Sequence, residues 1–152
     1  MSTQDKKTIN AIYPLQAGKI HRIVANHSDK ALTLGSNNAV VQTTYNGSAT
    51  SQYFVFHGAG EGYYYIRHRD SNKFMEVDGN LNTSGTKIVL ASYDHNSSHQ
   101  LFKLVPSGEG SWNIYPKNST RCLDIQWSSQ SNNAPLMLWG LNGNPNQQFK
   151  LR

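Results

Sequence analysis

The chain has 152 residues and a mass of 17.0 kDa, which is enough for one hydrophobic core and too little for two ordinary domains. Aromatic residues make up 11% of it, which excludes a disordered chain. The formal net charge is +5, but the 14 Lys and Arg are spread along the sequence, whereas nucleic-acid-binding proteins concentrate them in a patch. We therefore expect no nucleic-acid partner.

The chain lacks the long apolar runs of membrane proteins and signal peptides. No run approaches the roughly 18 apolar residues that a membrane span needs. No apolar region follows Lys6 and Lys7, as it would in a secretory signal. These features predict a protein that does not insert into membranes and is either cytoplasmic or released without a signal peptide.

Three copies of one pattern follow one another, at about residues 11–57, 58–105 and 106–152. Each copy ends in a Gln-x-Phe motif, and the motifs recur every 47 or 48 residues, starting at Gln52, Gln100 and Gln147. A short apolar segment lies upstream of each motif, at residues 30–34, 73–77 and 121–125. An isoleucine precedes each segment at a constant distance, and such a repeat indicates a fold built from three similar units.

Each copy is predicted to form about four short strands. In the middle copy they fall at residues 63–67, 74–77, 87–90 and 101–105. Turn-forming residues separate them, at 70–72, 78–80 and 96–98. No window has the apolar periodicity of a helix. Three copies of four strands predict an all-β fold, a closed β-trefoil with pseudo-threefold symmetry that forms one domain over residues 1–152, and closure removes exposed sheet edges.

The run from Tyr63 to Tyr65 could be taken for a binding platform. Because neighbouring residues of a strand point to opposite faces, at least one of the three rings should lie in the core. We interpret this run as mainly structural. A similar argument concerns the apolar residues Val41, Val89 and Met137, which share one position of the repeat and are predicted to lie in the core.

The three Gln-x-aromatic motifs resemble those of the ricin-B-type (R-type) lectin family, over roughly residues 11–152. The family's usual motif is Gln-x-Trp, and all three copies here have Phe, which fills a core equally well as a large apolar ring. The resemblance implies a β-trefoil with one potential sugar pocket per repeat. It also implies a preference for galactose and N-acetylgalactosamine on glycoproteins or glycolipids.

The third copy matches the family's binding motif best, at residues 121–125, 136–139 and 146–149. By this resemblance, Asp124 would accept hydrogen bonds from two sugar hydroxyls, and Trp139 would stack on the apolar face of the ring. Asn146 would supply an amide to another hydroxyl, and Gln147 would hold the geometry of the pocket. These side chains are also what a pyranose needs: an acceptor with several lone pairs, an amide and a flat apolar floor.

Two positions depart from the family pattern. Where the family often has a second Asp three residues after the first, this chain has Trp127, so Gln126 or Gln147 would have to steady Asp124, or specificity has moved. Gln126 and Trp127 are also candidate sugar-binding residues of this copy. The family's disulfide partner of Cys122 would fall at Leu141. Cys122 is the single cysteine, and we expect an inert, semi-buried thiol.

The second copy is a candidate second sugar site with different side chains. Glu76 replaces the aspartate, Ala91 the tryptophan and His99 the asparagine. Tyr93 would serve as a displaced floor, with Asp78 or His95 nearby.

The first copy is the poorest match. It has Thr33, Thr43 and Ser51 at the three positions, and its loop before Val41 is shorter.

Structural alternatives remain open for several of these residues. Trp139 could belong to the core, and Asp124 could make only local backbone bonds. His95 and His99 have the spacing of a helical metal pair, but they lie in a turn with no third ligand in view, so no metal and no cofactor is expected.

The chain contains none of the catalytic motifs for nucleophilic, metal-dependent or phosphate chemistry, and we expect a lectin and not an enzyme. Three alternatives share the predicted fold. These are a protease inhibitor, a binder of sulfated polymers, and a glycan-targeting subunit of a toxin or haemagglutinin complex. A homodimer would raise the avidity of a weak sugar site.

Overall fold

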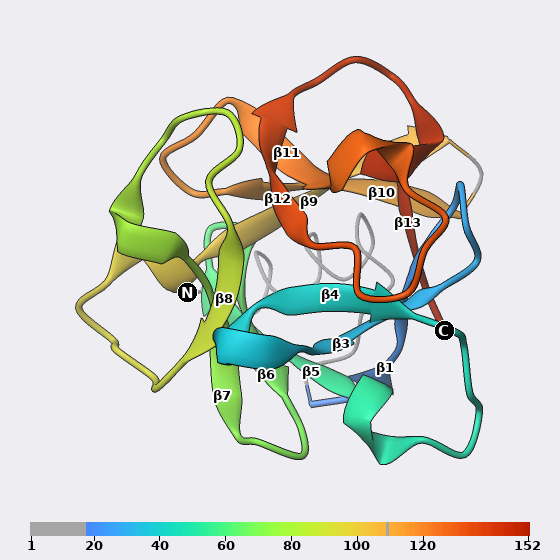
Figure 1. Cartoon of the computed structure of the whole chain (residues 1–152). Coiled ribbons are helices and arrows are strands. Elements are labelled where there is room, and N and C mark those ends of the chain that lie inside the picture. Colours follow the sequence, from blue (N-terminus) through green and yellow to red (C-terminus); the bar gives the residue numbers. More distant parts are fainter. Residues whose placement is uncertain (1–17, 109) are drawn as a thin grey trace.

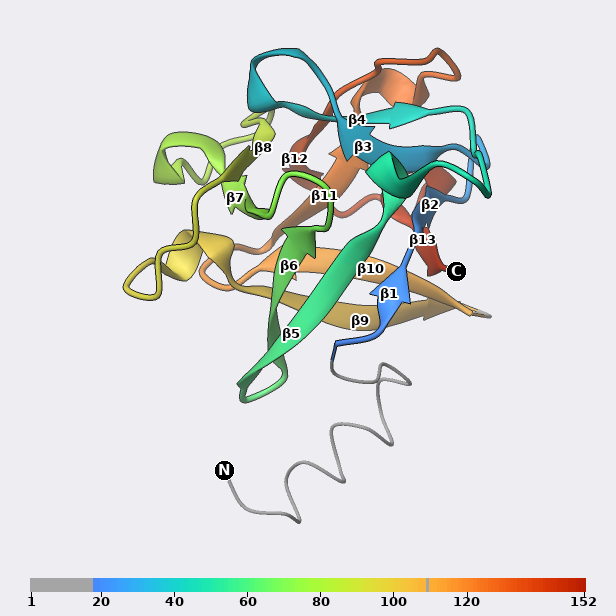
Figure 2. The same cartoon turned by 90° about the horizontal axis from the view of Figure 1, so that it is seen from below.

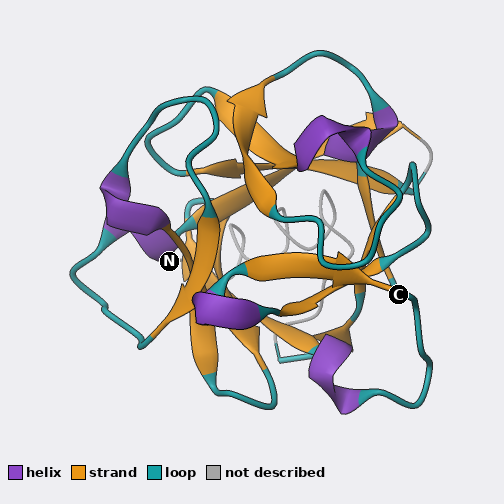
Figure 3. Cartoon of the chain, viewed as in Figure 1, coloured by secondary structure: helices purple, strands orange, loops and turns teal. Residues whose placement is uncertain are grey.

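The computed structural model describes residues 18–108 and 110–152. This part of the chain is almost entirely strands and loops, with short 3₁₀ helices between them (Figure 3). The strands are β1 (Ile20–His21), β2 (Ile23–Ala25), β3 (Ala31–Leu34), β4 (Val40–Thr43), β5 (Phe54–Gly60), β6 (Tyr63–His68), β7 (Lys73–Val77), β8 (Ile88–Ala91), β9 (Phe102–Gly108), β10 (Ser111–Pro116), β11 (Arg121–Ile125), β12 (Leu136–Gly140) and β13 (Phe149–Leu151). The helices are η1 (Ser36–Asn38), η2 (Thr50–Gln52), η3 (Asp78–Asn80), η4 (Ser98–Gln100), η5 (Gln126–Ser128) and η6 (Pro145–Gln147).

Six strand positions close into a barrel. Strands β5, β6, β9, β10 and β13 pair in that order, and β13 then pairs with β2 while β5 pairs with β1. Only Arg22 separates β1 from β2, and its backbone exchanges hydrogen bonds with Arg152 at the end of β13. The first strand of the chain therefore closes the ring, and Figure 2 shows the barrel strands below the remaining hairpins.

Three hairpins cover one end of the barrel: β3–β4, β7–β8 and β11–β12. Single backbone bridges join them in a triangle, between Ala39 and Val89, between Lys87 and Met137, and between Val41 and Pro135. Figure 1 looks onto this triangle, with one hairpin from each repeat. The predicted all-β, β-trefoil architecture with three repeats is confirmed.

The core is centred on the phenylalanines of the three Gln-x-Phe motifs. Phe54, Phe102 and Phe149 are each fully buried and belong to one hydrophobic cluster. Tyr64 is buried in the same cluster, whereas Tyr63 and Tyr65 are partly exposed. The prediction that the tyrosine run places at least one ring in the core is confirmed.

The prediction that Val41, Val89 and Met137 lie in the core holds in part: Val41 and Met137 are buried, Val89 is partly exposed, and none of the three belongs to the central cluster. Residues opposite each other in an antiparallel pair share a face, so Leu123 and Leu138 face the core together while Asp124 and Met137 share the outer face. The central cluster contains Leu136 and Leu138 but not Met137. Because residues 136–139 are all apolar, alternation alone did not show which face points inward.

No helix in residues 18–108 and 110–152 is long and apolar enough to cross a membrane.

Candidate functional site

The outer face of the β11–β12 hairpin carries the best predicted site residues. Cys122 pairs with Trp139 and Asp124 with Met137, so these four side chains share the face turned away from the core. Trp139 is 44% exposed, which rules out the alternative that it is a core residue.

Asp124 is held by two side-chain amides from η6. Its Oδ2 accepts a hydrogen bond from Gln147 Nε2 at 2.9 Å, and its Oδ1 accepts one from Asn146 Nδ2 at 3.1 Å. These contacts answer the question of what steadies the carboxylate: it is Gln147 and not Gln126, whose Oε1 accepts from Lys87 Nζ at 3.2 Å. They also contradict the alternative that Asp124 makes only local hydrogen bonds to the backbone.

The electrostatics of Asp124 reflect its position under the surface. The side chain is 3% exposed. Burial raises the pKa of Asp124 above its usual value, and the hydrogen bond from Gln147, the charge of His27 and the hydrogen bond from Asn146 offset part of that rise. The carboxylate thus keeps its orientation but carries a charge that is poorly solvated, and it is a strong acceptor for a ligand that brings donors.

Only the oxygen of the Asn146 amide is free to bind a ligand. Its Nδ2 donates to Asp124 Oδ1 and also to the carbonyl oxygen of Ile125 at 3.0 Å, so both of its N–H groups are used. Its Oδ1 is buried and has no hydrogen-bond partner among the described residues. Asn146 therefore offers an acceptor and not a donor, and such a buried acceptor favours a ligand hydroxyl.

A cavity of about 190 Å³ opens above these groups. We call it the repeat-three pocket; it is lined by Asp124, Trp127, Ser128, Met137, Trp139, Asn142, Asn144 and Asn146. Sequence reasoning missed the contributions of Ser128, Met137, Asn142 and Asn144. The only signal was the richness in Asn near the end of the chain, which by itself does not distinguish a loop from a binding site.

The glutamine of each Gln-x-Phe motif makes the same set of bonds in all three repeats. Its Oε1 accepts the backbone N–H of Asn46, Asp94 or Asn142, at 2.9 to 3.0 Å. Its Nε2 donates to the carbonyl oxygen of Thr44, Ser92 or Gly140, at 2.8 to 2.9 Å. The glutamine thus fixes the chain that leaves each hairpin, which explains why this residue recurs.

The Nε2 group of that glutamine also donates to a side chain, and this acceptor differs between the repeats. Gln147 donates to Asp124, Gln100 donates to Glu76 Oε1 at 3.2 Å, and Gln52 donates to Thr43 Oγ1 at 3.0 Å. The glutamine therefore holds a buried carboxylate in repeat three and a longer carboxylate in repeat two. In repeat one it holds Thr43, which stands at the position of Trp139, and it does not contact Thr33 at the position of the carboxylates.

A family model described as "Ricin-type beta-trefoil lectin domain-like" matches residues 12–91, 50–139 and 98–152 of the chain. These overlapping matches cover nearly the whole sequence. The chain belongs to this family. Comparison with curated proteins finds no match.

Solved structures of known proteins share the fold of this ricin-type domain. A designed threefold-symmetric protein, ThreeFoil, is 29% identical with a TM-score of 0.81, and the match covers 87% of this chain and 96% of that one. A ricin B-like lectin from Macrolepiota procera, solved in complex with lactose, is 16% identical with a TM-score of 0.76, over 90% of this chain and 96% of that one.

An exo-β-1,3-galactanase from Clostridium thermocellum is 23% identical with a TM-score of 0.80, and the match covers 87% of this chain but 29% of that enzyme. The ricin-type domain accounts for only that share of the enzyme. Family membership supports carbohydrate binding by the chain, whereas the likeness to the Macrolepiota procera lectin and to the galactanase, each less than 25% identical, shows the fold alone.

The candidate second site of the ricin-type domain has its side chains in different places. Glu76 is partly exposed, and Asp78 lies exposed in η3. Tyr93 is 51% exposed and packs against Tyr65 and Phe74, each with 5.1 Å between ring centroids, and His95 lies 6.3 Å from it. The structure thus brings Tyr93 and His95 together in an aromatic cluster.

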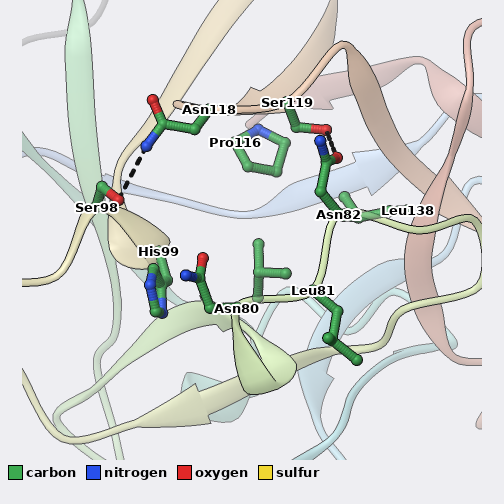
Figure 4. Close-up of a pocket in the computed structure, with 10 residues that line it drawn as sticks. Asn80, Leu81, Asn82, Ser98, His99, Pro116, Asn118, Ser119 and Leu138 are labelled. Atoms are coloured by element: carbon green, nitrogen blue, oxygen red, sulfur yellow. Dashed lines mark hydrogen bonds between the residues drawn. The ribbon is translucent and has the colours of Figure 1, made fainter.

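His99 lies apart from that cluster. It lines a small cavity of about 30 Å³ whose walls come from repeats two and three and include neither Glu76 nor Tyr93 (Figure 4). In Figure 4 its ring lies beside Asn80, and a hydrogen bond of 3.0 Å joins Asn118 to Ser98, the chain neighbour of His99. Among the described residues, no hydrogen bond joins His99 to Glu76, in contrast to the Asn146–Asp124 pair.

Repeat one uses its hydroxyl groups internally. Thr33 Oγ1 donates to the carbonyl oxygen of Ser51 at 2.8 Å, and Thr43 Oγ1 accepts from Gln52. No carboxylate stands at either position.

Two chemical alternatives gain no support from the described residues. No group of three His, Cys, Asp or Glu there is arranged to hold a metal ion. Cys122 is fully buried, where we expected a semi-buried thiol, and its Sγ donates to the carbonyl oxygen of Trp139 on the paired strand. Burial raises the pKa of Cys122 to about 12, so it carries no thiolate for nucleophilic chemistry at neutral pH.

Proposed function

We propose that the protein is a non-catalytic lectin that binds terminal galactose or N-acetylgalactosamine of glycans in the repeat-three pocket. The observation that carries the proposal is a buried carboxylate, Asp124, at the base of a cavity whose wall is the half-exposed ring of Trp139. The lactose complex of a structural neighbour supports the choice of a galactose-type sugar as the first ligand to test.

The polar atoms of the pocket suit a ligand that donates hydrogen bonds. Each oxygen of Asp124 already accepts one amide and has a lone pair left, and Oδ1 of Asn146 is an additional acceptor. The hydroxyls of a pyranose would donate to these atoms while the apolar face of the ring packs on Trp139. The axial hydroxyl of galactose leaves one ring face more continuously apolar, which suits that wall.

A shallow pocket with a few hydrogen bonds and one stacked ring should bind a monosaccharide with a Kd between about 1 mM and tens of micromolar, or roughly 4 to 7 kcal/mol. Glycans on glycoproteins or glycolipids would be held more tightly if two pockets engage at once. Such avidity would come from repeat two, from a homodimer or from assembly into a toxin or haemagglutinin complex.

The proposal is tested by calorimetric titration of the wild type and three variants, one of them a control, with lactose and N-acetylgalactosamine. Asp124→Ala should abolish binding because it removes the charged acceptor, and Trp139→Ala should weaken it strongly because it removes the wall. Glu76→Ala, at the equivalent position of repeat two, is the matched control and should retain binding in repeat three. Circular dichroism of each variant verifies that the trefoil is intact.

Binding by Asp124→Ala at the strength of the wild type would move the site away from repeat three. No binding of either sugar by the folded wild type would overturn the galactose-type specificity and leave the trefoil fold untouched.

A sulfated polymer is the ligand class that such a result would bring forward. Folding gathers three arginines around two tyrosines: Arg22 lies over Tyr45 and Tyr53, Arg69 over Tyr53 and Arg152 over Tyr45. Arg22 is buried and donates to the carbonyl oxygen of Gly47, so its role is structural and two exposed guanidinium groups remain. Retention on heparin that falls steeply with salt would support this second reading.

A further inference from the structure

Trp127 is the most exposed large hydrophobic side chain of the described residues, with 86% of its surface accessible. It lies in η5, three residues after Asp124, and lines the repeat-three pocket. Among the described residues, no aromatic ring packs against its indole. The trefoil core therefore does not require this ring.

The backbone at Trp127 is also unusual, and the other two repeats provide the comparison. The middle residue of η1, η3 and η5 has a left-handed conformation in each case, with φ of 56° at Asn37, 64° at Gly79 and 58° at Trp127. Asn and Gly adopt this conformation readily, whereas a bulky side chain does so at a cost. Only repeat three places a large residue there.

Two unfavourable features thus coincide at one residue: an exposed apolar ring and a left-handed backbone. They occur in the one repeat whose hairpin carries the buried aspartate and the pocket. A residue that breaks local preferences without contributing to the core is expected at a functional position. The position beside the pocket indicates which function the ring serves.

The size and charge of the pocket indicate what Trp127 would contact. A volume of about 190 Å³ is below the roughly 300–1,000 Å³ of sites for drug-sized ligands, so it suits one sugar ring and not two. A second ring would lie outside, at the rim formed by Trp127 and Ser128. Asp124 is the only charged residue of the lining, which leaves no cationic partner there for an acidic sugar.

We propose that Trp127 forms an outer subsite that packs against the second, neutral hexopyranose of an oligosaccharide whose terminal sugar occupies the repeat-three pocket. The inference rests on the proposed function, since the terminal sugar must be bound first. The indole would bury part of the second ring's apolar face, and roughly 50 Å² of such contact corresponds to about a tenfold gain in affinity. Repeats one and two, with Asn37 and Gly79, have no equivalent ring.

The test is a calorimetric titration with methyl β-galactoside, which supplies one ring, and with lactose, which supplies two. The wild type should bind lactose about tenfold more tightly than the monosaccharide. Trp127→Asn, which installs the residue that repeat one tolerates at this backbone conformation, should fold normally and bind both ligands with the affinity of the monosaccharide. Leu141→Asn removes another exposed apolar side chain, one outside the pocket lining, and should keep the difference between the two ligands.

The outcomes separate this inference from the function on which it rests. If the wild type binds the monosaccharide but shows no gain for lactose, or if Trp127→Asn keeps the gain, the outer subsite is wrong and the lectin function stands. Equal weakening of both ligands by Trp127→Asn would place the indole in the first subsite and overturn the inference. If the wild type binds neither ligand, the proposed specificity and the outer subsite both fail.

Discussion

Asp124 combines three properties that are rarely found together in one side chain: burial, charge and contacts with two amides. The amides of Asn146 and Gln147 fix its orientation, but both are neutral, so burial still dominates and raises the pKa of Asp124. A sugar would therefore meet a carboxylate that is already oriented and only partly compensated.

The raised pKa predicts a pH dependence of sugar binding with a definite sign. Binding should weaken as pH falls through the pKa of Asp124, above the usual value of about 3.9 for Asp, because the protonated acid loses its charge and an acceptor site. Titrations with lactose from pH 7 downward would show this. Binding that stays constant to below pH 4 in the folded protein would contradict the assignment of Asp124.

Unfolding would not mimic that loss through the same group. Since the pKa of Asp124 is higher in the folded than in the unfolded state, the folded protein binds more protons between the two values. The contribution of Asp124 to the free energy of unfolding is therefore fully present at low pH and is lost as pH rises through the folded-state pKa. Circular dichroism at each pH provides the control.

At the scale of single residues, the sequence predicted which residues line the pocket better than it predicted how their side chains are oriented. Asp124, Trp139 and Asn146 do line one cavity, as the resemblance implied. The direction of the Asn146 amide depends on the carbonyl of Ile125, a backbone contact that no residue pattern contains. The exposure of Trp127 follows from a left-handed turn in η5, which a sequence reader would assign to Asn or Gly and not to Trp.

At the scale of elements, each Gln-x-Phe motif joins a hairpin to the next barrel strand. The phenylalanine begins the strand and fills the core, while the glutamine holds the chain that leaves the hairpin. The motif spacing predicted the three repeats, and the apolar segments between turn-forming residues predicted the strands. Neither pattern predicted which face of residues 136–139 points inward, because both faces of that strand are apolar.

The hydrogen bonds of the motif glutamine predict that the protein loses stability when this residue is replaced in repeat one, outside the repeat-three pocket. Gln52→Leu deletes hydrogen bonds to Thr43, Thr44 and Asn46. At about 1 kcal/mol for each of the three bonds, the free energy of unfolding should fall by about 3 kcal/mol. Urea denaturation measures this change, and sugar binding by the folded variant should be unchanged.

Gln130→Leu is a suitable control for this variant. Gln130 is exposed and makes one hydrogen bond, to the carbonyl oxygen of His27. Its substitution should alter the free energy of unfolding by no more than about 0.5 kcal/mol. Equal effects of the two substitutions would show that the hydrogen bonds of the buried glutamine do not stabilise the fold.

At the scale of the whole molecule, closure of the barrel makes each repeat depend on contacts with the other two. Repeat one supplies the strand that closes the barrel against β13, and the bridges between hairpins link every pair of repeats. The threefold pattern in the sequence predicted this architecture because the core residues recur in register. Differences between the repeats, such as the position of His99, arise where loops from two repeats meet, and no single repeat encodes them.

A shared core predicts that the molecule unfolds as one cooperative unit, and the tryptophans allow a direct test. All three, Trp112, Trp127 and Trp139, lie in repeat three, so intrinsic fluorescence reports on that repeat alone. Phe102→Ala removes a fully buried ring of repeat two and should cost about 3–5 kcal/mol. Because β9, which Phe102 begins, pairs with β10 of repeat three, the fluorescence midpoint in urea should shift as far as the midpoint from far-ultraviolet circular dichroism. A fluorescence midpoint that stays at the wild-type value while the dichroism midpoint falls would show that repeat three is stable without its neighbours, and the closed barrel would then not be the unit that supports the sugar pocket.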